Sequence, residues 1–252
     1  MPKKDKREYR RYSPVAVVGF IFALLAGCAE IVAGFGTRWG LWDYRQGFAI
    51  LRWAAYAGIA VSLISLLGCF MARPGGMRRG FVLSLGGLLI AIAVFGVPWS
   101  LQLKARQVPA IHDITTDMDN PPKFVSLLPQ RKLAVNKFEY GGPEVAAKQR
   151  VAYPDIVPLE LPLSPMEAFK LALAAARDLD WRVIDASEQE GRIEATDTTF
   201  WFGFKDDIVV RVAPTARGSR IDVRSVSRVG RSDVGANAKR IREFLKIIRK
   251  PG

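Results

Sequence analysis

The sequence predicts three transmembrane helices followed by one water-soluble α+β domain, with an antiparallel sheet of four or five strands. Three long apolar runs lie within residues 1–103, whereas later apolar residues recur at the spacing of amphipathic helices and strands. The charge is also uneven: residues 1–103 carry 12 Lys or Arg against 4 Asp or Glu, and residues 104–252 carry 25 against 20. We therefore divide the chain into a membrane region, 1–103, and a soluble domain, 104–252.

Each apolar run is long enough to cross a bilayer. The runs are Pro14–Gly36, Phe48–Met71 and Gly80–Leu101, and about 20 helical residues span a hydrocarbon core of about 30 Å. A single run of this kind could be a helix buried in a globular core, but three in succession with short linkers favour a membrane region. The lipid bilayer is therefore the first predicted partner.

The basic residues beside the runs predict the orientation. Six Lys or Arg lie in the N-terminal tail and three in the loop between the second and third runs, whereas four lie on the opposite side. Basic residues accumulate on the cytoplasmic side of membrane proteins, so the N-terminus is expected in the cytoplasm and the soluble domain outside it. In a Gram-negative cell this describes a multi-pass inner-membrane protein with a periplasmic domain. Because the excess charge lies mainly beside the membrane, no nucleic-acid partner is expected.

Two charged residues lie inside the apolar runs. Glu30 is six residues before the end of the first run, and Arg52 is four residues after the start of the second. At 1.5 Å per residue both lie about 6–9 Å below the same membrane face, which predicts an intramembrane ion pair. A role for Glu30 in moving a proton or a substrate is the alternative, because a carboxylate in the bilayer is costly.

Both cysteines, Cys28 and Cys69, lie in apolar runs, so the soluble domain has neither disulfide nor thiol chemistry. The stretch Leu25–Cys28 resembles a bacterial lipobox, and the alternative is therefore a lipoprotein acylated at Cys28. The apolar run continues beyond Cys28 to Phe35, however, whereas a processed signal normally ends near its cleavage site. We therefore expect the first run to remain as an uncleaved span.

The soluble domain is expected to contain three helices. A short helix over Gly142–Ala152 has a proline near its start. A capping box formed by Ser164 and Glu167 begins the second helix, and Ser232 or Asp233 caps the third. The core stripe of the third helix is predicted to be Val234, Ala238, Ile241, Leu245 and Ile248.

Segments rich in branched and aromatic residues are expected to be strands. Short connections between them imply antiparallel neighbours, and the helices would then cover one face of the sheet. The predicted strands are Trp181–Asp185, Arg192–Thr196, Thr198–Phe204, Ile208–Ala213 and Arg220–Val229.

Several separate motifs in this domain carry a resemblance to a known family. They are IHDITTD, NPP, AYPDI, GRIEAT, FWFGFKDDIVVRV and RIDVRSVSRVGRSDVGANAKRIREF. Together, over roughly Ile111–Leu245, they resemble the bacterial family known as domain of unknown function 1499, some members of which have a similar three-span region. The resemblance implies that the soluble part is a single domain, and it supplies no activity, ligand or catalytic residue.

Catalysis is poorly supported by the residue types present. The domain has no cysteine, one histidine (His112) and no serine in a nucleophile-elbow pattern. Asp206, Asp207 and His112 are the candidates for a metal-assisted hydrolase, although adjacent residues of a strand point to opposite faces. We therefore expect a non-enzymatic module without a metal or cofactor, for binding or for organising the cell envelope, and the hydrolase is the alternative.

Regularly spaced arginines predict an anion-binding face. Arg220, Arg224 and Arg228 lie on one side of a strand, and Arg211 belongs to the preceding strand. The chain then passes through Ser232 to a helix N-terminus, which favours negative charge. We assign Arg211, Arg224, Arg228 and Ser232 to a site for an anionic lipid, a glycan or an envelope protein. The alternative is a face of Arg–Asp pairs with a structural role.

Overall fold

The computed structural model describes residues 11–249, so most of the basic N-terminal tail lies outside the described part. The chain separates into two compact units, and each is described by itself. The first consists of residues 1–103 with the short stretch Trp201–Gly203, and the second consists of the remaining residues from Lys104 onward.

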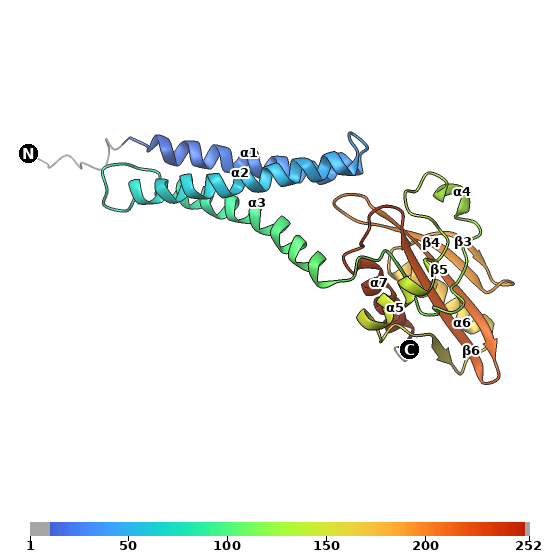
Figure 1. The fold of residues 1–252 in the computed structure, drawn as a ribbon. Helices are drawn as coiled ribbons and strands as arrows, with labels where there is room; N and C mark the ends of the chain where they lie inside the picture. Colours follow the sequence, from blue (N-terminus) through green and yellow to red (C-terminus); the bar gives the residue numbers. More distant parts are fainter. Residues whose placement is uncertain (1–10, 250–252) are drawn as a thin grey trace, which may run out of the picture. The chain divides into compact units, whose positions relative to one another are not determined.

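Three long apolar helices form the first unit (Figure 1): α1 Pro14–Arg38, α2 Tyr44–Met71 and α3 Phe81–Gln107. The three predicted apolar helices are confirmed, and each is long and apolar enough to be a candidate membrane span. The helices are longer than the apolar runs, because polar residues at the ends of a span continue the backbone hydrogen bonding. α1 continues without a break through Cys28.

The three helices pack on one another through small residues. Ala23 and Ala91 are fully buried, and a Cβ atom added to Gly58 would lie 3.0 Å from the carbonyl oxygen of Ala91. The backbones of α2 and α3 therefore approach closely. Large apolar side chains such as Leu25 and Leu63 are exposed instead. This is the arrangement of spans that meet lipid outside and pack by van der Waals contact inside.

Glu30 and Arg52 do not form the predicted ion pair in the described part of the chain. Glu30 is 9% exposed, and its Oε1 atom has no hydrogen-bond partner there. Arg52 is exposed, because the buried face of α2 passes through its neighbours Leu51 and Ala54. The two residues match in depth along their helices but not in direction around the helix axes, and depth was all that the spacing could predict.

The second unit is built on a six-stranded antiparallel sheet, which confirms the predicted fold class with more strands than expected. The strand order is β1-β6-β5-β4-β3, and β2 also pairs with β6. The two additional strands have three residues each, too few for an alternating pattern. The bounds are β1 Asp113–Thr115, β2 Leu159–Leu161, β3 Arg182–Ser187, β4 Arg192–Thr198, β5 Lys205–Thr215 and β6 Gly218–Ser227.

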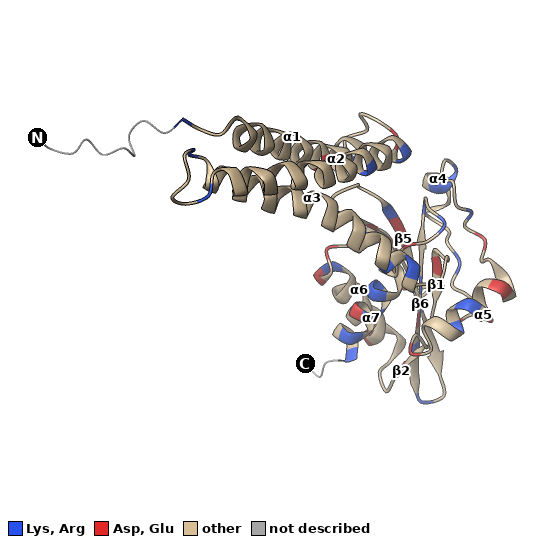
Figure 2. Cartoon of the chain, turned by 60° about the vertical axis from the view of Figure 1, so that its left-hand side comes forward, with Lys and Arg blue, Asp and Glu red and all other residues tan. Residues whose placement is uncertain are grey.

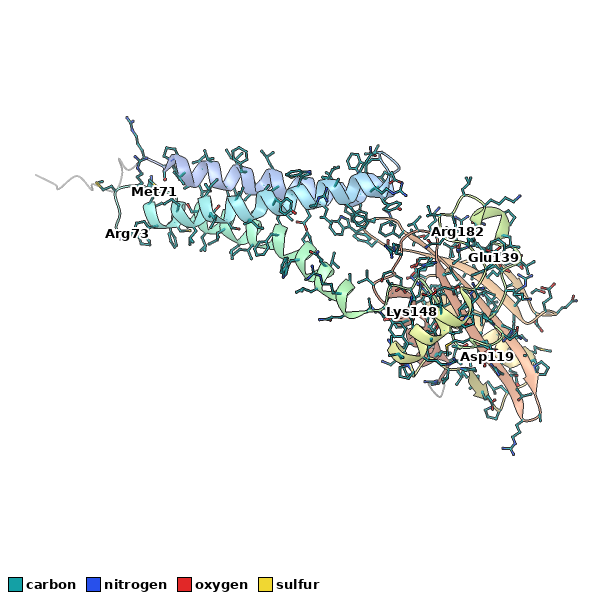
Figure 3. The ribbon with its side chains drawn as sticks, in the orientation of Figure 1. Met71, Arg73, Asp119, Glu139, Lys148 and Arg182 are labelled. Atoms are coloured by element: carbon teal, nitrogen blue, oxygen red, sulfur yellow. The ribbon has the colours of Figure 1, made fainter. Side chains whose placement is uncertain are left out.

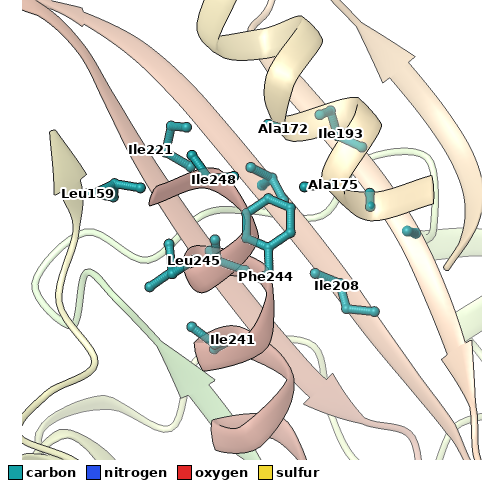
Figure 4. Close-up of a cluster of buried hydrophobic side chains, with 14 of the residues drawn as sticks. Leu159, Ala172, Ala175, Ile193, Ile208, Ile221, Ile241, Phe244, Leu245 and Ile248 are labelled. Carbon is teal, nitrogen blue, oxygen red and sulfur yellow. The ribbon is translucent and has the colours of Figure 1, made fainter. Parts of the chain in front are cut away.

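One face of the sheet packs against α6 (Pro165–Asp178) and α7 (Ala236–Arg249). α6 begins at the predicted capping box: the Ser164 hydroxyl accepts from the Glu167 backbone N–H at 3.3 Å, and the Glu167 carboxylate accepts from the Ser164 N–H at 2.9 Å. In the core, the ring of Phe244 stacks on Trp181 with centroids 5.1 Å apart. Figure 4 shows Phe244 among aliphatic side chains of α6, α7 and the strands.

The opposite face of the sheet is covered by the segment 116–140, which contains α4 (Leu128–Arg131) and precedes α5 (Gly142–Ala152). The apolar cluster on this face is small and consists of Phe124, Leu127, Val209 and Val226 with two partly buried neighbours. Most other buried side chains on this face are charged. Figure 2 marks Lys and Arg in blue and Asp and Glu in red along the chain. Strand alternation therefore separates a mainly apolar face from a charged face.

Two local predictions are wrong. Residues 199–204 are not a strand but the β4–β5 connection, in which the Thr199 N–H donates to the Phe204 carbonyl at 2.9 Å and Gly203 has φ +68°. The aromatic content favoured a strand, but the turn needs a positive φ at glycine. Val234 does not belong to the core stripe of α7, because it is 42% exposed and has φ +53° in the turn before the helix.

Candidate functional site

Strand alternation brings three of the four predicted site residues onto the charged face. The register of β5 and β6 places Arg211 opposite Asp222 and Val209 opposite Arg224. Directly opposed residues of antiparallel strands share a face, and so do residues two apart on one strand. Arg211, Arg224 and Arg228 therefore lie together on the face that segment 116–140 covers.

Arg224 is the most buried of the predicted residues, at 3% exposed. Its Nε and Nη2 atoms donate to the two oxygens of Asp113 at 2.9 and 2.8 Å. Further hydrogen bonds go to the carbonyl oxygens of Pro122 and Phe138 at 3.2 and 2.7 Å. Asp113 comes from β1, and β1 pairs with β6. The guanidinium group is thus held in a bidentate ion pair that specifies its position.

Arg228 shares a carboxylate with an arginine that the sequence analysis missed. Arg228 donates to both oxygens of Asp207 at 2.8 Å, and Arg131 of α4 donates to the same carboxylate at 2.6 Å. The side chains of Arg131 and Asp207 are 0% exposed. Burial lowers the pKa of the Arg131 guanidinium, and the charge of Asp207 opposes that shift. No sequence pattern distinguishes Arg131 from an ordinary exposed loop arginine.

Arg211 is also paired. Its Nη2 atom donates to Asp222 at 2.8 Å and to Asp117 at 2.9 Å, and Arg220 contacts the same two carboxylates. Ser232 lies beyond the end of β6. Its hydroxyl donates to the Pro109 carbonyl at 3.4 Å and accepts from the Val234 backbone N–H at 3.2 Å. The structure therefore places Ser232 apart from the three arginines.

Asp206 and Asp207 lie on opposite faces of the sheet. Asp206 accepts from Arg240 of α7 at 2.7 Å, on the face opposite to Arg131 and Arg228. His112 precedes β1, and its side chain belongs to neither ion pair. The structure does not bring the three candidate hydrolase residues together. In the described part of the chain, no group of three His, Cys, Asp or Glu residues is placed to hold a metal ion.

A cavity of about 360 Å³ lies beside Arg224. Its size is within the range of about 300–1,000 Å³ typical of small-molecule sites. The wall is mainly aromatic and apolar, with charged groups at a few positions. It is formed by Pro121, Lys123 and Phe124 from one stretch of the covering segment, by Phe138, Glu139 and Tyr140 from a second stretch, and by Arg224.

The guanidinium group of Arg224 lies over two aromatic rings of this cavity. Its central carbon is 5.4 Å from the ring centroid of Phe124 and 5.6 Å from that of Tyr140. Such contacts attract the cation to the ring faces. Burial, and secondarily the charge of Asp113, raise the pKa of Tyr140 to about 12. Its hydroxyl is therefore protonated, and a hydrogen-bond donor, throughout the physiological range.

A second cavity, of about 440 Å³, shares Glu139 and Tyr140 with the first. It also contains His112, Asp113 and Lys148. Figure 3 labels Glu139 and Lys148 on the domain. Lys148 is paired with Glu144 at 2.6 Å, one helical turn earlier on α5. Tyr140 thus separates an aromatic cavity from one with more charged groups.

Comparisons with known proteins identify the family of the second unit. No curated protein matches the chain. A family model described as protein of unknown function (DUF1499) matches residues 113–248, more than half of the chain. The match begins at β1 and ends within α7, so it includes the whole sheet, both faces and the Arg224 cavity. The chain therefore belongs to the DUF1499 family, with three candidate membrane-spanning helices before the family domain.

Proposed function

We propose that this chain is a multi-pass protein of a bacterial inner membrane that holds a non-enzymatic binding domain in the periplasm. The orientation is supported by the basic residues of the N-terminal tail and of the α2–α3 loop, where Arg73, Arg78 and Arg79 are exposed. Positive charge on these segments favours the cytoplasmic side, and three crossings then carry the domain to the other side.

Alkaline phosphatase fusions test this orientation, because the enzyme is active only outside the cytoplasm. A fusion after Gly252 is expected to be active, and a fusion in the loop after Arg73 is expected to be inactive. The reverse pattern would refute the orientation. Mass spectrometry of the purified chain checks the lipoprotein alternative, since a mature chain starting at acylated Cys28 would lack the first half of α1.

The domain is proposed to bind a small anion in the Arg224 cavity. The observation that carries this proposal is a cavity of about 360 Å³ in which Arg224 and Lys123 meet three aromatic side chains. Arg211 and Arg228 add positive charge to the same face, although both are paired with carboxylates. Binding is favoured over hydrolysis because Asp206 and Asp207 are held apart by separate arginines.

Charge reversal at the cavity tests anion binding. Lys123 borders the cavity and is exposed, so Lys123→Glu is expected to fold normally and to bind anions about tenfold more weakly, as charge-assisted contacts contribute roughly 1.5–3 kcal/mol. Lys132→Glu is the matched control, because this exposed lysine is in the same covering segment but does not border the cavity.

The probes are inorganic phosphate, a sugar phosphate and a short-chain anionic phospholipid, each titrated into the full-length protein by calorimetry. Saturable binding of at least one probe, weakened by Lys123→Glu and unchanged by Lys132→Glu, is the expected result. Equal binding by the two variants, or no saturable binding of any anion, would remove the proposal.

A further inference from the structure

The hydroxyl of Tyr140 is buried and has no hydrogen-bond partner among the described residues. A buried donor without an acceptor destabilises the folded domain, because the group loses its hydrogen bonds to water. Tyr140 borders both cavities, so an acceptor placed in the aromatic cavity could satisfy it. Binding would then recover an interaction that the protein alone does not make.

Arg224 has one further donor to offer. A guanidinium group carries five N–H hydrogens, and four have acceptors: two on Asp113, and the carbonyl oxygens of Pro122 and Phe138. The remaining hydrogen is on Nη1. Lys123 borders the same cavity and forms no ion pair within the described residues. Tyr140, Arg224 and Lys123 thus supply donors that an acceptor group of a ligand could use together.

The rest of the cavity wall specifies the body of the ligand. Pro121, Phe124 and Phe138 present apolar surface, which favours an aromatic or aliphatic group. The charge of Arg224 is already balanced by Asp113, so Lys123 is the lining cation that a single negative charge on a ligand can meet. A dianion would also be repelled by Asp113, which is bound to Arg224.

Building on the proposed function, we propose that the Arg224 cavity binds an amphiphilic monocarboxylate. Its apolar body packs against Phe124 and Phe138, and its carboxylate accepts hydrogen bonds from the Tyr140 hydroxyl and the remaining Arg224 Nη1–H. Lys123 contributes a third, charged donor from the edge of the cavity. The body is either an aromatic ring system or a medium-length aliphatic chain, since the wall offers the same apolar contacts to both.

Tyr140→Phe isolates the hydroxyl from the packing of the ring. The substitution removes the donor while keeping the ring against Arg224, so it should abolish the ligand contact without lowering the stability of the free protein. Tyr153→Phe is the matched control. The Tyr153 hydroxyl is also buried without a partner in the described part, but it borders neither cavity.

The experiment is equilibrium dialysis of the full-length protein in nanodiscs of zwitterionic lipid against labelled 1-naphthoate and octanoate, with empty nanodiscs subtracted. At least one carboxylate is expected to saturate at one site per chain. Tyr140→Phe should weaken that binding about ten- to a hundredfold, whereas Tyr153→Phe should match the wild type. Naphthalenemethanol, the neutral counterpart of naphthoate, should bind more weakly. The arm that saturates identifies the body as aromatic or aliphatic.

Each other result overturns the inference. Wild-type affinity in Tyr140→Phe would show that the hydroxyl does not contact the ligand, and a lower melting temperature of this variant would show that the hydroxyl already has a partner. If neither carboxylate binds but another anion binds in a Lys123-dependent way, anion binding is supported and the amphiphilic monocarboxylate is refuted as its ligand. If no anion binds at all, both the proposed anion-binding function and the monocarboxylate ligand are refuted.

Discussion

The two faces of one sheet are stabilised in different ways. The face under α6 and α7 is mainly apolar, apart from the Arg240–Asp206 pair, and its side chains come largely from helices and strands that a regular pattern predicts. The face under segment 116–140 is held mainly by ion pairs between residues far apart in the chain, such as Arg131 with Asp207 and Arg224 with Asp113. The same alternation along β5 and β6 supplies both faces.

The comparison shows why the two faces differ in their capacity to bind a ligand. An apolar contact is non-directional, so a close-packed core leaves little room and few polar groups without partners, although the Tyr153 hydroxyl on the apolar side is one. A face of buried charges needs partners in defined geometry, and groups without one remain. Within the described residues such groups include the Tyr140 hydroxyl and Arg131 Nε, both on the charged side of the sheet. Ligand binding is therefore expected on this side rather than between the sheet and α7.

The largest expected difference between the faces is in how a lost contact can be rescued. Arg224→Ala should lower the free energy of unfolding by about 3–5 kcal/mol, because it leaves the buried Asp113 carboxylate unpaired. Adding Asp113→Ala removes that unpaired charge, so the double variant should be more stable than Arg224→Ala alone. Hydrogen exchange of β5 and β6 peptides in the full-length protein measures both.

The apolar face supplies the control for this rescue. Phe244→Ala should cost a similar amount, about 3–5 kcal/mol, by opening a cavity beside Trp181. Adding Trp181→Ala should then cause a further loss instead of a recovery. A stability change below about 0.5 kcal/mol in Arg224→Ala would mean that the guanidinium group behaves as an exposed one, and the distinction between the faces would disappear.

A smaller effect concerns how the stability contributed by the charged face depends on pH. The Ser126 hydroxyl donates to Asp185 at 2.8 Å, and Arg192 lies 2.9 Å from the same carboxylate. The hydrogen bond from Ser126, followed by the charge of Arg192, lowers the pKa of Asp185. A depressed folded-state pKa gives stability that is present above the unfolded value of about 3.9 and is lost as the pH falls through the folded value.

Ser126→Ala should therefore be less stable than the wild type at neutral pH, and the difference should shrink below about pH 4. Denaturation of the full-length protein from pH 2 to pH 7 measures this difference. Ser187→Ala serves as the control, because the Ser187 hydroxyl accepts from the Glu190 backbone N–H and does not contact Asp185. A difference that stays constant with pH would assign the effect to packing.

The sequence by itself determined the class of every long element. Three apolar runs predicted the three long helices, the Ser164–Glu167 spacing predicted the start of α6, and alternation placed Arg220, Arg224 and Arg228 on one face. These features are local, since helix and strand periods are set by residues a few positions apart. The family match likewise reflects motifs that can be recognised along the chain.

Only the tertiary structure decided which charges meet. Glu30 and Arg52 match in depth yet do not pair, whereas Arg224 pairs with Asp113, 111 residues away in the chain. The position of segment 116–140 over the sheet also forms the Arg224 cavity and leaves the Tyr140 hydroxyl without a partner among the described residues. Ion pairs and hydrogen bonds depend on distances of about 3 Å and on direction, and sequence spacing does not specify either between distant segments.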